Sequence, residues 1–309
     1  MSPRNTAECG GKWRRGRRPN LKKADAGPPV ALTVDVHADD RPEDITAAAE
    51  WLAHRGLPGT FFVPSTLLVA GRYRSRLIEV PKLGHEVGSH THTHGWEEMA
   101  ALRDGDGSAL RFLEHSKYIY EETYGCSPCS FRSPCWSALG SSALDELQRL
   151  GYAVDSSATP QRLPLLGSNP YKMAWAGSPR GTYLLRPGLV EVPTSTFIVP
   201  ASSNTFRLLR RLSPAFLALL LAEARLLPDR VIVLQFHPAD FCASRGNPAM
   251  GRPLRLGDFA LRGEGGFAFR DRLLQTDPAR IHTRMSAIAD SVGGFRCGTL
   301  AEISMGLRG

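Results

Sequence analysis

Short apolar segments alternate with amphipathic helical segments along most of this chain, and this alternation restricts its fold more than any other feature. The first example is PVALTVDV at residues 29–36, followed at 43–56 by EDITAAAEWLAHRG, whose apolar residues recur at helical spacing. A short β-branched run of this kind is typical of a parallel strand that is buried on both faces. Repeated alternation of strand and helix predicts a parallel sheet with flanking helices, either an α/β barrel or a doubly wound sheet.

The same pattern predicts the other elements. Further strands are expected at 59–64, 85–90, 129–132, 152–157 and 231–237, and further helices at 108–125, 141–151 and 277–294. Two stretches interrupt the pattern: residues 159–204 are rich in Pro, Gly and Ser, and residues 239–276 are rich in Gly and Arg. We interpret both as loops or insertions around a site, with plain surface excursions as the alternative.

The stretch at 204–230, NTFRLLRRLSPAFLALLLAEARLLPDR, is helical in pattern and apolar on nearly all sides in its second half. We expect a buried or capping helix here. The alternative is an amphipathic helix in peripheral contact with a membrane surface, with Arg207, Arg210 and Arg211 at headgroup level. No apolar run approaches the ~18–20 residues that a transmembrane helix needs, which argues against an integral membrane protein.

The positive charge of the chain is concentrated at its start. Residues 1–23 contain eight of the 38 Lys and Arg residues and one of the 30 acidic residues, so they carry +7 of the formal net charge of +8. The nearly neutral remainder gives no electrostatic reason to expect specific nucleic-acid binding. We predict a basic, disordered tail at 1–28 and one folded domain at 29–309. The tail lacks the apolar core of a secretory signal, so a cytoplasmic location is expected.

Ionisable side chains follow five of the predicted strands. They are Asp35 and His37 in VDVH, the histidines of GSHTHTH, Arg132 in FRSP, Asp155 in VDSS and His237 in LQFH. In parallel α/β folds the carboxyl ends of the strands meet on one rim, where chemistry collects. Carboxylates and imidazoles that converge there suit a divalent metal with an open coordination position, together with a base and an acid for hydrolysis.

The three histidines of HTHTH at 90–94 can be arranged around a metal in two ways. On a strand His90, His92 and His94 would share one face, whereas on a helical turn only His90 and His94 would lie side by side. Two imidazoles on one zinc ion bring their nitrogens within about 3–3.5 Å, but strand positions i and i+4 are about 13 Å apart. A strand could still offer His90 with His92, so both arrangements stay open on spacing alone.

These motifs resemble the NodB-like polysaccharide deacetylases, carbohydrate esterase family 4. HTHTH at 90–94 matches the family's H-[S/T]-x-x-H motif, and GTFFVP at 59–64 looks like its A-T-F-F-V strand. RSP at 132–134 matches R-x-P, and LQFHP at 234–238 is similar to L-x-H with one residue more. The resemblance covers about residues 29–305 in the family's order. The resemblance is stronger to the subgroup with a D-V-[D/E] first motif than to members with a T-F-D-D-G-P first motif. The former subgroup includes allantoinase-like relatives.

The resemblance implies a distorted (β/α) barrel of parallel strands with flanking helices, in which residues 29–309 form a deacetylase catalytic domain. It implies that His90 and His94 bind a divalent metal, for which we expect zinc, and that His92 points elsewhere. The implied reaction is metal-dependent hydrolysis of the N-acetyl group of an amino sugar, in a glycan or a lipid-linked saccharide.

The resemblance also implies roles for residues around the metal. Asp35 would be the general base, His237 would protonate the leaving amine, and Arg132 would pair with and orient a site carboxylate. For Asp155 we expect either that it supports this rim from behind or that it begins a turn with Ser156 and Ser157.

The first motif departs from the family. In D-V-[D/E] members the residue two after the base is a carboxylate metal ligand, but here that residue is His37. Either His37 binds directly and gives a three-histidine site, or Asp39 or Asp40 supplies an oxygen. We favour His37, which shares a face with Asp35 at the end of an apolar strand, whereas a carboxylate near the start of a helix already has a capping role.

Three other functions are kept as alternatives. An allantoinase-like hydrolase of a small cyclic amide would use the same barrel. A catalytically inactive carbohydrate-binding barrel is disfavoured because the base, the acid and two ligands are all present. A nucleic-acid binder that relies on the basic tail is the least favoured. The sequence predicts neither the sugar nor the oligomeric state.

Overall fold

The computed structural model describes residues 27–160, 177–227, 229–242, 261–262, 266–267 and 278–307. The predicted basic tail therefore lies almost wholly outside the described residues, as do the beginning of the stretch at 159–204 and most of 239–276.

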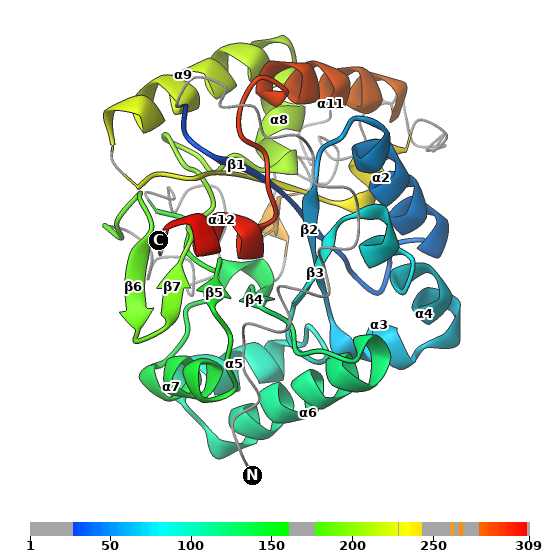
Figure 1. Cartoon of the computed structure of the whole chain (residues 1–309), viewed down its shortest axis with the longest axis vertical. Coiled ribbons are helices and arrows are strands. Elements are labelled where there is room, and N and C mark those ends of the chain that lie inside the picture. The colour runs from blue at the N-terminus through cyan, green and yellow to red at the C-terminus, as the bar shows by residue number, and fades with distance from the viewer. Residues whose placement is uncertain are drawn as a thin grey trace.

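The centre of the molecule is a curled sheet of eight strands in the order β6-β7-β5-β4-β3-β2-β1-β8 (Figure 1). The strands are β1 (Val30–Asp35), β2 (Gly59–Val63), β3 (Glu86–Ser89), β4 (Ser130–Phe131), β5 (Val154–Asp155), β6 (Tyr183–Arg186), β7 (Leu189–Glu191) and β8 (Ile232–Phe236). All neighbouring pairs are parallel except β6 and β7, which are antiparallel. Every residue of β1, β2 and β8 is buried, as expected for strands covered on both faces.

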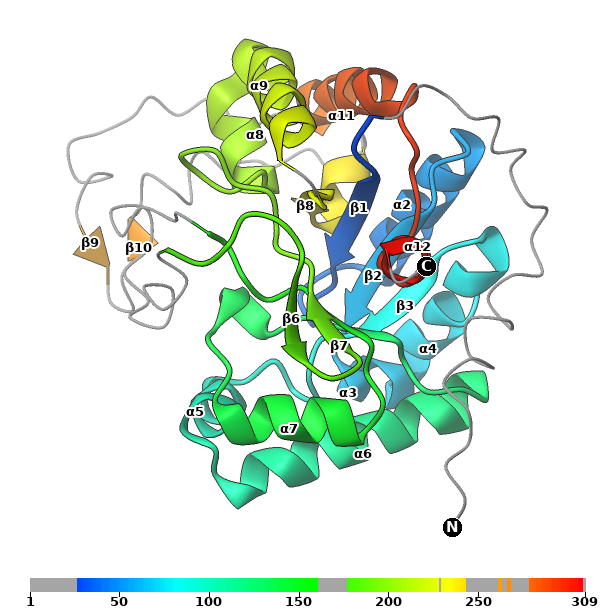
Figure 2. The same ribbon diagram turned by 60° about the vertical axis from the view of Figure 1, so that its left-hand side comes forward.

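Helices surround the sheet (Figure 2). They are α2 (Pro42–His54), α3 (Ser65–Val69), α4 (Gly71–Leu77), α5 (Trp96–Asp104), α6 (Gly107–Tyr124), α7 (Ser141–Arg149), α8 (Ser203–Leu209), α9 (Ser213–Leu226), α11 (Pro278–Val292) and α12 (Leu300–Leu307). Short 3-10 turns are η1 (Val80–Leu83), η2 (Pro134–Trp136), η5 (Arg210–Leu212) and η6 (Pro238–Phe241), and β9 (Leu261–Arg262) pairs with β10 (Gly266–Phe267) away from the main sheet. In Figure 1, α5, α6 and α7 line one end of the molecule and α8, α9 and α11 the other.

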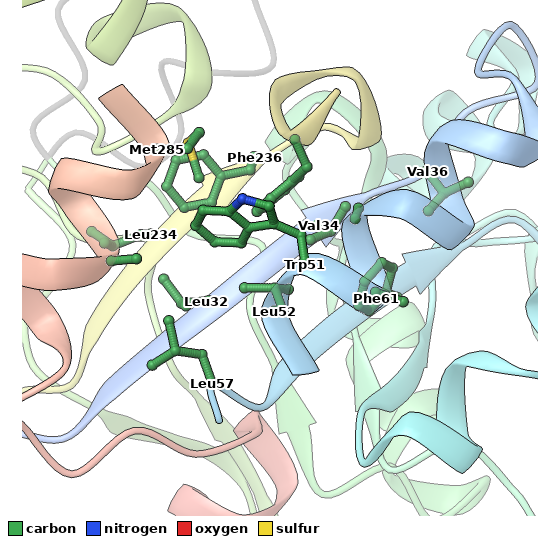
Figure 3. Packing of buried hydrophobic residues seen from close by; sticks show 14 of the residues in the cluster. Leu32, Val34, Val36, Trp51, Leu52, Leu57, Phe61, Leu234, Phe236 and Met285 are labelled. Atoms are coloured by element: carbon green, nitrogen blue, oxygen red, sulfur yellow. The ribbon is translucent and has the colours of Figure 1, made fainter. Parts of the chain in front are cut away.

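The largest apolar core packs β1 and β8 against α2 and α11. Figure 3 shows Leu32 and Val34 of β1 and Phe236 of β8 gathered around Trp51 of α2. The Trp51 ring also meets Phe241 edge to face at a centroid distance of 5.3 Å. Close packing of this kind holds β1 and β8 rigidly side by side, so the residues that follow these two strands are placed next to each other.

The segment after β7 brings the two ends of the sheet together. The Thr194 N–H donates to Ala158 O beyond β5 at 2.9 Å, and the Ser195 N–H donates to Val233 O of β8 at 3.0 Å. Gln235 N in turn donates to Ala201 O at 2.9 Å. The curled sheet is thus nearly closed into the distorted barrel that was predicted.

Two expectations need correction. The stretch at 159–204 is more than a loop, because it contributes β6 and β7, and the antiparallel β6 makes the sheet mixed rather than wholly parallel. The predicted helix at 204–230 is divided into α8, η5 and α9, and α9 buries one side that includes Phe216 and Leu220. Among the described residues no helix has the length and apolar character needed to span a membrane.

Candidate metal centre and catalytic site

The structure gathers the predicted site residues at the carboxyl ends of the strands. Asp35 ends β1 and His37 follows it, His90 and His94 follow β3, Arg132 follows β4, and His237 follows β8. Parallel register between β8, β1, β2 and β3 puts these ends on one rim. Asp155 ends β5 on the same rim but lies outside the histidine cluster.

Three histidines from two strand ends form the cluster. One ring nitrogen each from His37, His90 and His94 lies within 4.8 Å of the others, the only such grouping found in the described part of the chain. The His37 and His94 rings have centroids 4.6 Å apart, and those of His90 and His94 are 4.9 Å apart. Small movements of the side chains would bring these nitrogens to the about 3–3.5 Å separation that ligands of one zinc ion have.

The chemistry of these donors fits a metal ion. His94 Nε2 is buried and meets no hydrogen-bond partner among the described residues. Burial lowers the pKa of His90 to about 3, and burial with the neighbouring His237 and His94 lowers the pKa of His37. Neutral imidazoles with an available lone pair are the form that binds zinc.

The loop that carries His90 and His94 is neither a strand nor a helical turn. β3 ends at Ser89, and both Thr91 (φ 66°) and His94 (φ 64°) adopt the left-handed conformation. This conformation is uncommon for residues other than glycine and must be held by the surroundings. It folds the chain so that His94 returns beside His90.

A buried glutamate that the sequence did not reveal holds this loop. The Glu98 side chain, in the first turn of α5, accepts hydrogen bonds from the backbone N–H groups of His92 (2.7 Å) and Thr93 (2.8 Å). It also accepts one from the Thr93 hydroxyl at 2.8 Å. The neighbouring Glu97 is exposed, and nothing in the sequence pattern distinguishes the two.

His92 points away from the cluster, as predicted. Its Nδ1 lies 2.7 Å from Ser65 Oγ, and its ring stacks on Phe112 and contacts His115. A rotation into the cluster would break all three contacts.

His90 is oriented by the strand end next to it. Its Nδ1 lies 2.8 Å from the Arg132 carbonyl oxygen, so Nδ1–H donates and Nε2 is left for a metal. A second ring nitrogen anchored in this way fixes the tautomer and the direction of a metal-binding histidine.

Asp35 and Arg132 form a buried ion pair beside the cluster. Arg132 Nη1 donates to Asp35 Oδ1 at 2.7 Å and to Thr33 Oγ1 at 2.8 Å. The other guanidinium nitrogens bind Ser156, with Nε donating to its carbonyl oxygen and Nη2 to its hydroxyl. Burial by itself would raise the pKa of Asp35, but Arg132 and the neighbouring imidazoles outweigh it and keep this pKa below its ordinary value.

His237 completes the rim. Its Nδ1 lies 3.1 Å from the Asp35 carbonyl oxygen, and its ring centroid is 4.9 Å from that of His37. The half-buried ring thus stands between β1 and β8, on the edge of the histidine cluster.

The two acidic alternatives to His37 have other positions. Asp40 Oδ2 accepts the His37 N–H at 2.8 Å, and Asp39 is exposed. Asp240 holds the His237 N–H in the same way, also at 2.8 Å. Asp40 and Asp240 therefore each brace the turn of a site histidine, and neither Asp39 nor Asp40 belongs to the cluster. That His37 is a metal ligand stays a prediction.

Comparisons with known proteins find a matching family profile and similar folds. The sequence profile of the polysaccharide deacetylase family matches residues 22–154. No curated protein matches the chain significantly.

Similar solved structures come from several organisms. A candidate polysaccharide deacetylase from Mycobacterium smegmatis superposes with a TM-score of 0.56 at 18% identity, covering 93% of both chains. The Xyl-CE4 domain of a multidomain xylanase from the hindgut metagenome of Trinervitermes trinervoides gives 0.48 at 15% identity over 92% of both chains. Peptidoglycan deacetylase PdaC from Bacillus subtilis gives 0.44 at 15% identity, over 91% of this chain and 93% of its own. The first of these likenesses shows that the curled sheet with flanking helices is the NodB-like deacetylase fold.

Proposed function

We propose that this protein is a metal-dependent hydrolase that removes the N-acetyl group from an amino sugar of a glycan or lipid-linked saccharide. The observation that carries the proposal is the three-histidine cluster next to the Asp35–Arg132 pair and His237. The matching deacetylase profile and the shared fold support the choice of an acetyl group as the target.

His37, His90 and His94 would hold the metal, and zinc suits a set of three imidazoles. A bound divalent ion would polarise the acetamide carbonyl and make a water molecule more acidic. The loop held by Glu98 and the hydrogen bond from His90 to Arg132 O fix the directions of these ligands before substrate arrives.

Asp35 is the proposed general base. Its Oδ1 is held by Arg132, so Oδ2 is the oxygen that takes a proton from the attacking water. The lowered pKa of Asp35 keeps it ionised and ready at neutral pH.

His237 is the proposed general acid. The Asp35 carbonyl oxygen holds Nδ1–H, so Nε2 is the nitrogen that delivers a proton to the departing amine. Asp35 and His237 belong to the neighbouring strand ends of β1 and β8, so water activation and departure of the amine have separate groups.

Acetate release tests the proposal directly. Purified protein, with and without a chelator, is incubated with acetylated glycans, acetylated nucleotide sugars, lipid-linked saccharides and cyclic ureides. We expect chelator-sensitive acetate release from at least one amino-sugar substrate. Ring opening of a ureide without acetate release would favour the cyclic-amide alternative, and no turnover together with saccharide binding would favour an inactive binding barrel.

A further inference from the structure

The outer side of α9 exposes large apolar side chains along its whole length. Eleven such side chains are exposed among the described residues, and four of them lie within residues 212–227. They are Leu212 (64% exposed), Leu219 (51%), Leu226 (81%) and Leu227 (37%). The first three recur every seven residues, which is close to two helical turns, so they follow one side of the helix. A contiguous exposed apolar surface of this kind marks a site of interaction.

Small apolar residues fill the spaces between these leucines. The opposite side of the helix packs into the core through residues such as Phe216 and Leu220. A helix that is apolar on all sides is normally buried all round, but α9 lies at the outer edge of the molecule in both views (Figures 1 and 2). We call its exposed side the α9 face, which consists of Leu212, Pro214, Ala215, Ala218, Leu219, Ala222 and Leu226.

Positive charges lie at both ends of the α9 face. Arg211 is exposed immediately before α9, and Arg225 is exposed in its last turn. Glu223 is the only acidic residue between positions 203 and 227, and its carboxylate forms ion pairs with Arg180 and, at 2.7 Å, with Arg230. This carboxylate therefore adds no uncompensated negative charge, and the surface is apolar with cationic ends.

The most basic segment of the chain joins the folded domain near one of these ends. The Arg225 guanidinium lies 5.7 Å from the centroid of the Phe295 ring. The next residue, Arg296, accepts the Val30 N–H through its carbonyl oxygen at 3.0 Å. The first described residues of the chain therefore lie close to the end of α9. Residues 1–23, which carry a formal charge of +7, are attached at this point.

We propose that the α9 face docks on the surface of an anionic lipid bilayer. Its leucines enter the boundary between headgroups and acyl chains, and Arg211 and Arg225 reach the headgroup phosphates. Arg207, which the sequence suggested for headgroup contact, instead donates to Asp240 at 3.1 Å. A small apolar contact binds a membrane weakly by itself, so the basic segment at 1–23 supplies the second contact. The inference goes beyond the proposed function and does not depend on it.

The same charges argue against a second copy of the chain as the occupant. Antiparallel pairing of two α9 faces would bring Arg211 of one copy towards Arg225 of the other, and parallel pairing would bring each arginine towards its counterpart. Either arrangement also gathers two segments of charge +7. Like charges that face each other are destabilising, whereas an anionic surface complements all of them.

Sedimentation with lipid vesicles tests the proposal on the full-length protein without any substrate. The vesicles contain phosphatidylcholine, with or without anionic phosphatidylglycerol. We expect the wild type to bind the anionic vesicles at least about tenfold more strongly. Leu219→Gln/Leu226→Gln should lower this binding by about tenfold or more, and Arg211→Gln/Arg225→Gln by about fivefold for each charge.

Val69→Gln/Tyr118→Gln is the matched control. It replaces two exposed apolar side chains on α3 and α6, at the opposite end of the molecule from α9 (Figure 1), and should leave vesicle binding unchanged.

Two results would overturn the proposal. Anionic vesicles that bind the folded leucine and arginine variants as strongly as the wild type would show that α9 takes no part. A wild-type dimer in sedimentation velocity without lipid, which the leucine variant converts to a monomer, would show that a second copy covers the α9 face. Circular dichroism and thermal melting verify that each variant folds, and the arginine variant alone decides if the leucine variant does not.

Discussion

The two ends of the central sheet both bury ionisable groups, but the hydrogen bonds of these groups are completed differently. At the amino end, Glu86 of β3 accepts hydrogen bonds from Thr60 Oγ1 (2.9 Å), Ser130 Oγ (2.6 Å) and Ala301 N–H of α12 (3.1 Å). The Thr60 hydroxyl also accepts the Leu300 N–H, so α12 is fastened across this end. At the carboxyl end, His94 Nε2 has no such partner among the described residues.

This difference distinguishes polar groups that are buried to stabilise the fold from polar groups that are buried to bind a ligand. A buried group whose hydrogen bonds are complete, like Glu86, contributes to stability and offers nothing to a ligand. A buried imidazole nitrogen without a partner costs free energy, and such a cost is tolerated where a ligand supplies the missing bond. From this comparison we expect chemistry at the carboxyl end and stability at the amino end.

The largest expected effect on activity comes from replacing a proposed metal-binding histidine at the carboxyl end of the sheet. His94→Ala should lose the metal and fall to background activity, because it removes one of the three imidazoles that form the proposed site. His92→Ala, two residues earlier, is the matched control and should keep the metal, since His92 faces Ser65 and Phe112. Metal content by mass spectrometry checks both, and equal loss in the two variants would contradict the assignment.

Asp35→Asn should lower kcat by about 10²–10⁴-fold while leaving the metal content and the fold intact. The amide keeps the shape of Asp35 but cannot take a proton. Steady-state rates and metal analysis on the same sample check this prediction. Activity within a few fold of wild type would remove Asp35 as the base.

His237→Ala should slow hydrolysis of an acetamide by about 10–100-fold more than hydrolysis of an activated acetate ester. An amine must be protonated as it leaves, whereas the leaving group of an activated ester needs little help. Rates on a matched amide and ester pair give the ratio. The same loss on both substrates would show that His237 is not the acid.

A substitution at the amino end of the sheet should change the stability of the protein and not its catalytic rate. Glu86→Ala should lower the free energy of unfolding by about 2–4 kcal/mol, because Thr60, Ser130 and Ala301 lose a buried acceptor. Activity per folded molecule should stay at the wild-type level. A folded Glu86→Ala protein with normal stability but impaired turnover would contradict a purely structural role for the amino end.

The smallest expected effect is that of Glu86→Gln. This variant tests whether the stability of the wild type falls as the pH rises. Burial raises the pKa of Glu86 above 4.5, so the folded protein keeps a proton that the unfolded chain releases. This contribution to stability is complete below pH 4.5 and is lost as the pH rises through the folded-state pKa. Chemical denaturation at several pH values should show this slope in the wild type and not in Glu86→Gln.

The sequence predicted residues that follow apolar strands better than residues whose partners depend on loop conformation. The common position of Asp35, His37, Arg132 and His237 was predicted because parallel strand ends share a rim, a rule that needs no knowledge of loops. The left-handed turns at Thr91 and His94 run against local preference, so neither a strand nor a helical turn describes the loop.

Other features of the site were not predicted because they depend on residues that are far apart in the sequence. Glu98 acts through backbone N–H groups that only the folded loop presents to it. Glu191 of β7 lies beside Asp155 only once β7 has paired with β5, across the Pro-, Gly- and Ser-rich stretch that we interpreted as a loop or an insertion. Very short strands such as β6 and β7 carry too few residues for a period of two to be recognised.

Titration of metal-free protein with zinc tests the central claim most directly. Bound zinc and acetate release from an acetylated amino-sugar substrate are measured on the same samples. The account predicts that activity rises in proportion to bound zinc and stops rising at about one ion per chain, the number that one three-histidine site can hold. Full acetate release by the metal-free protein, or zinc binding that is unchanged in His94→Ala, would contradict it.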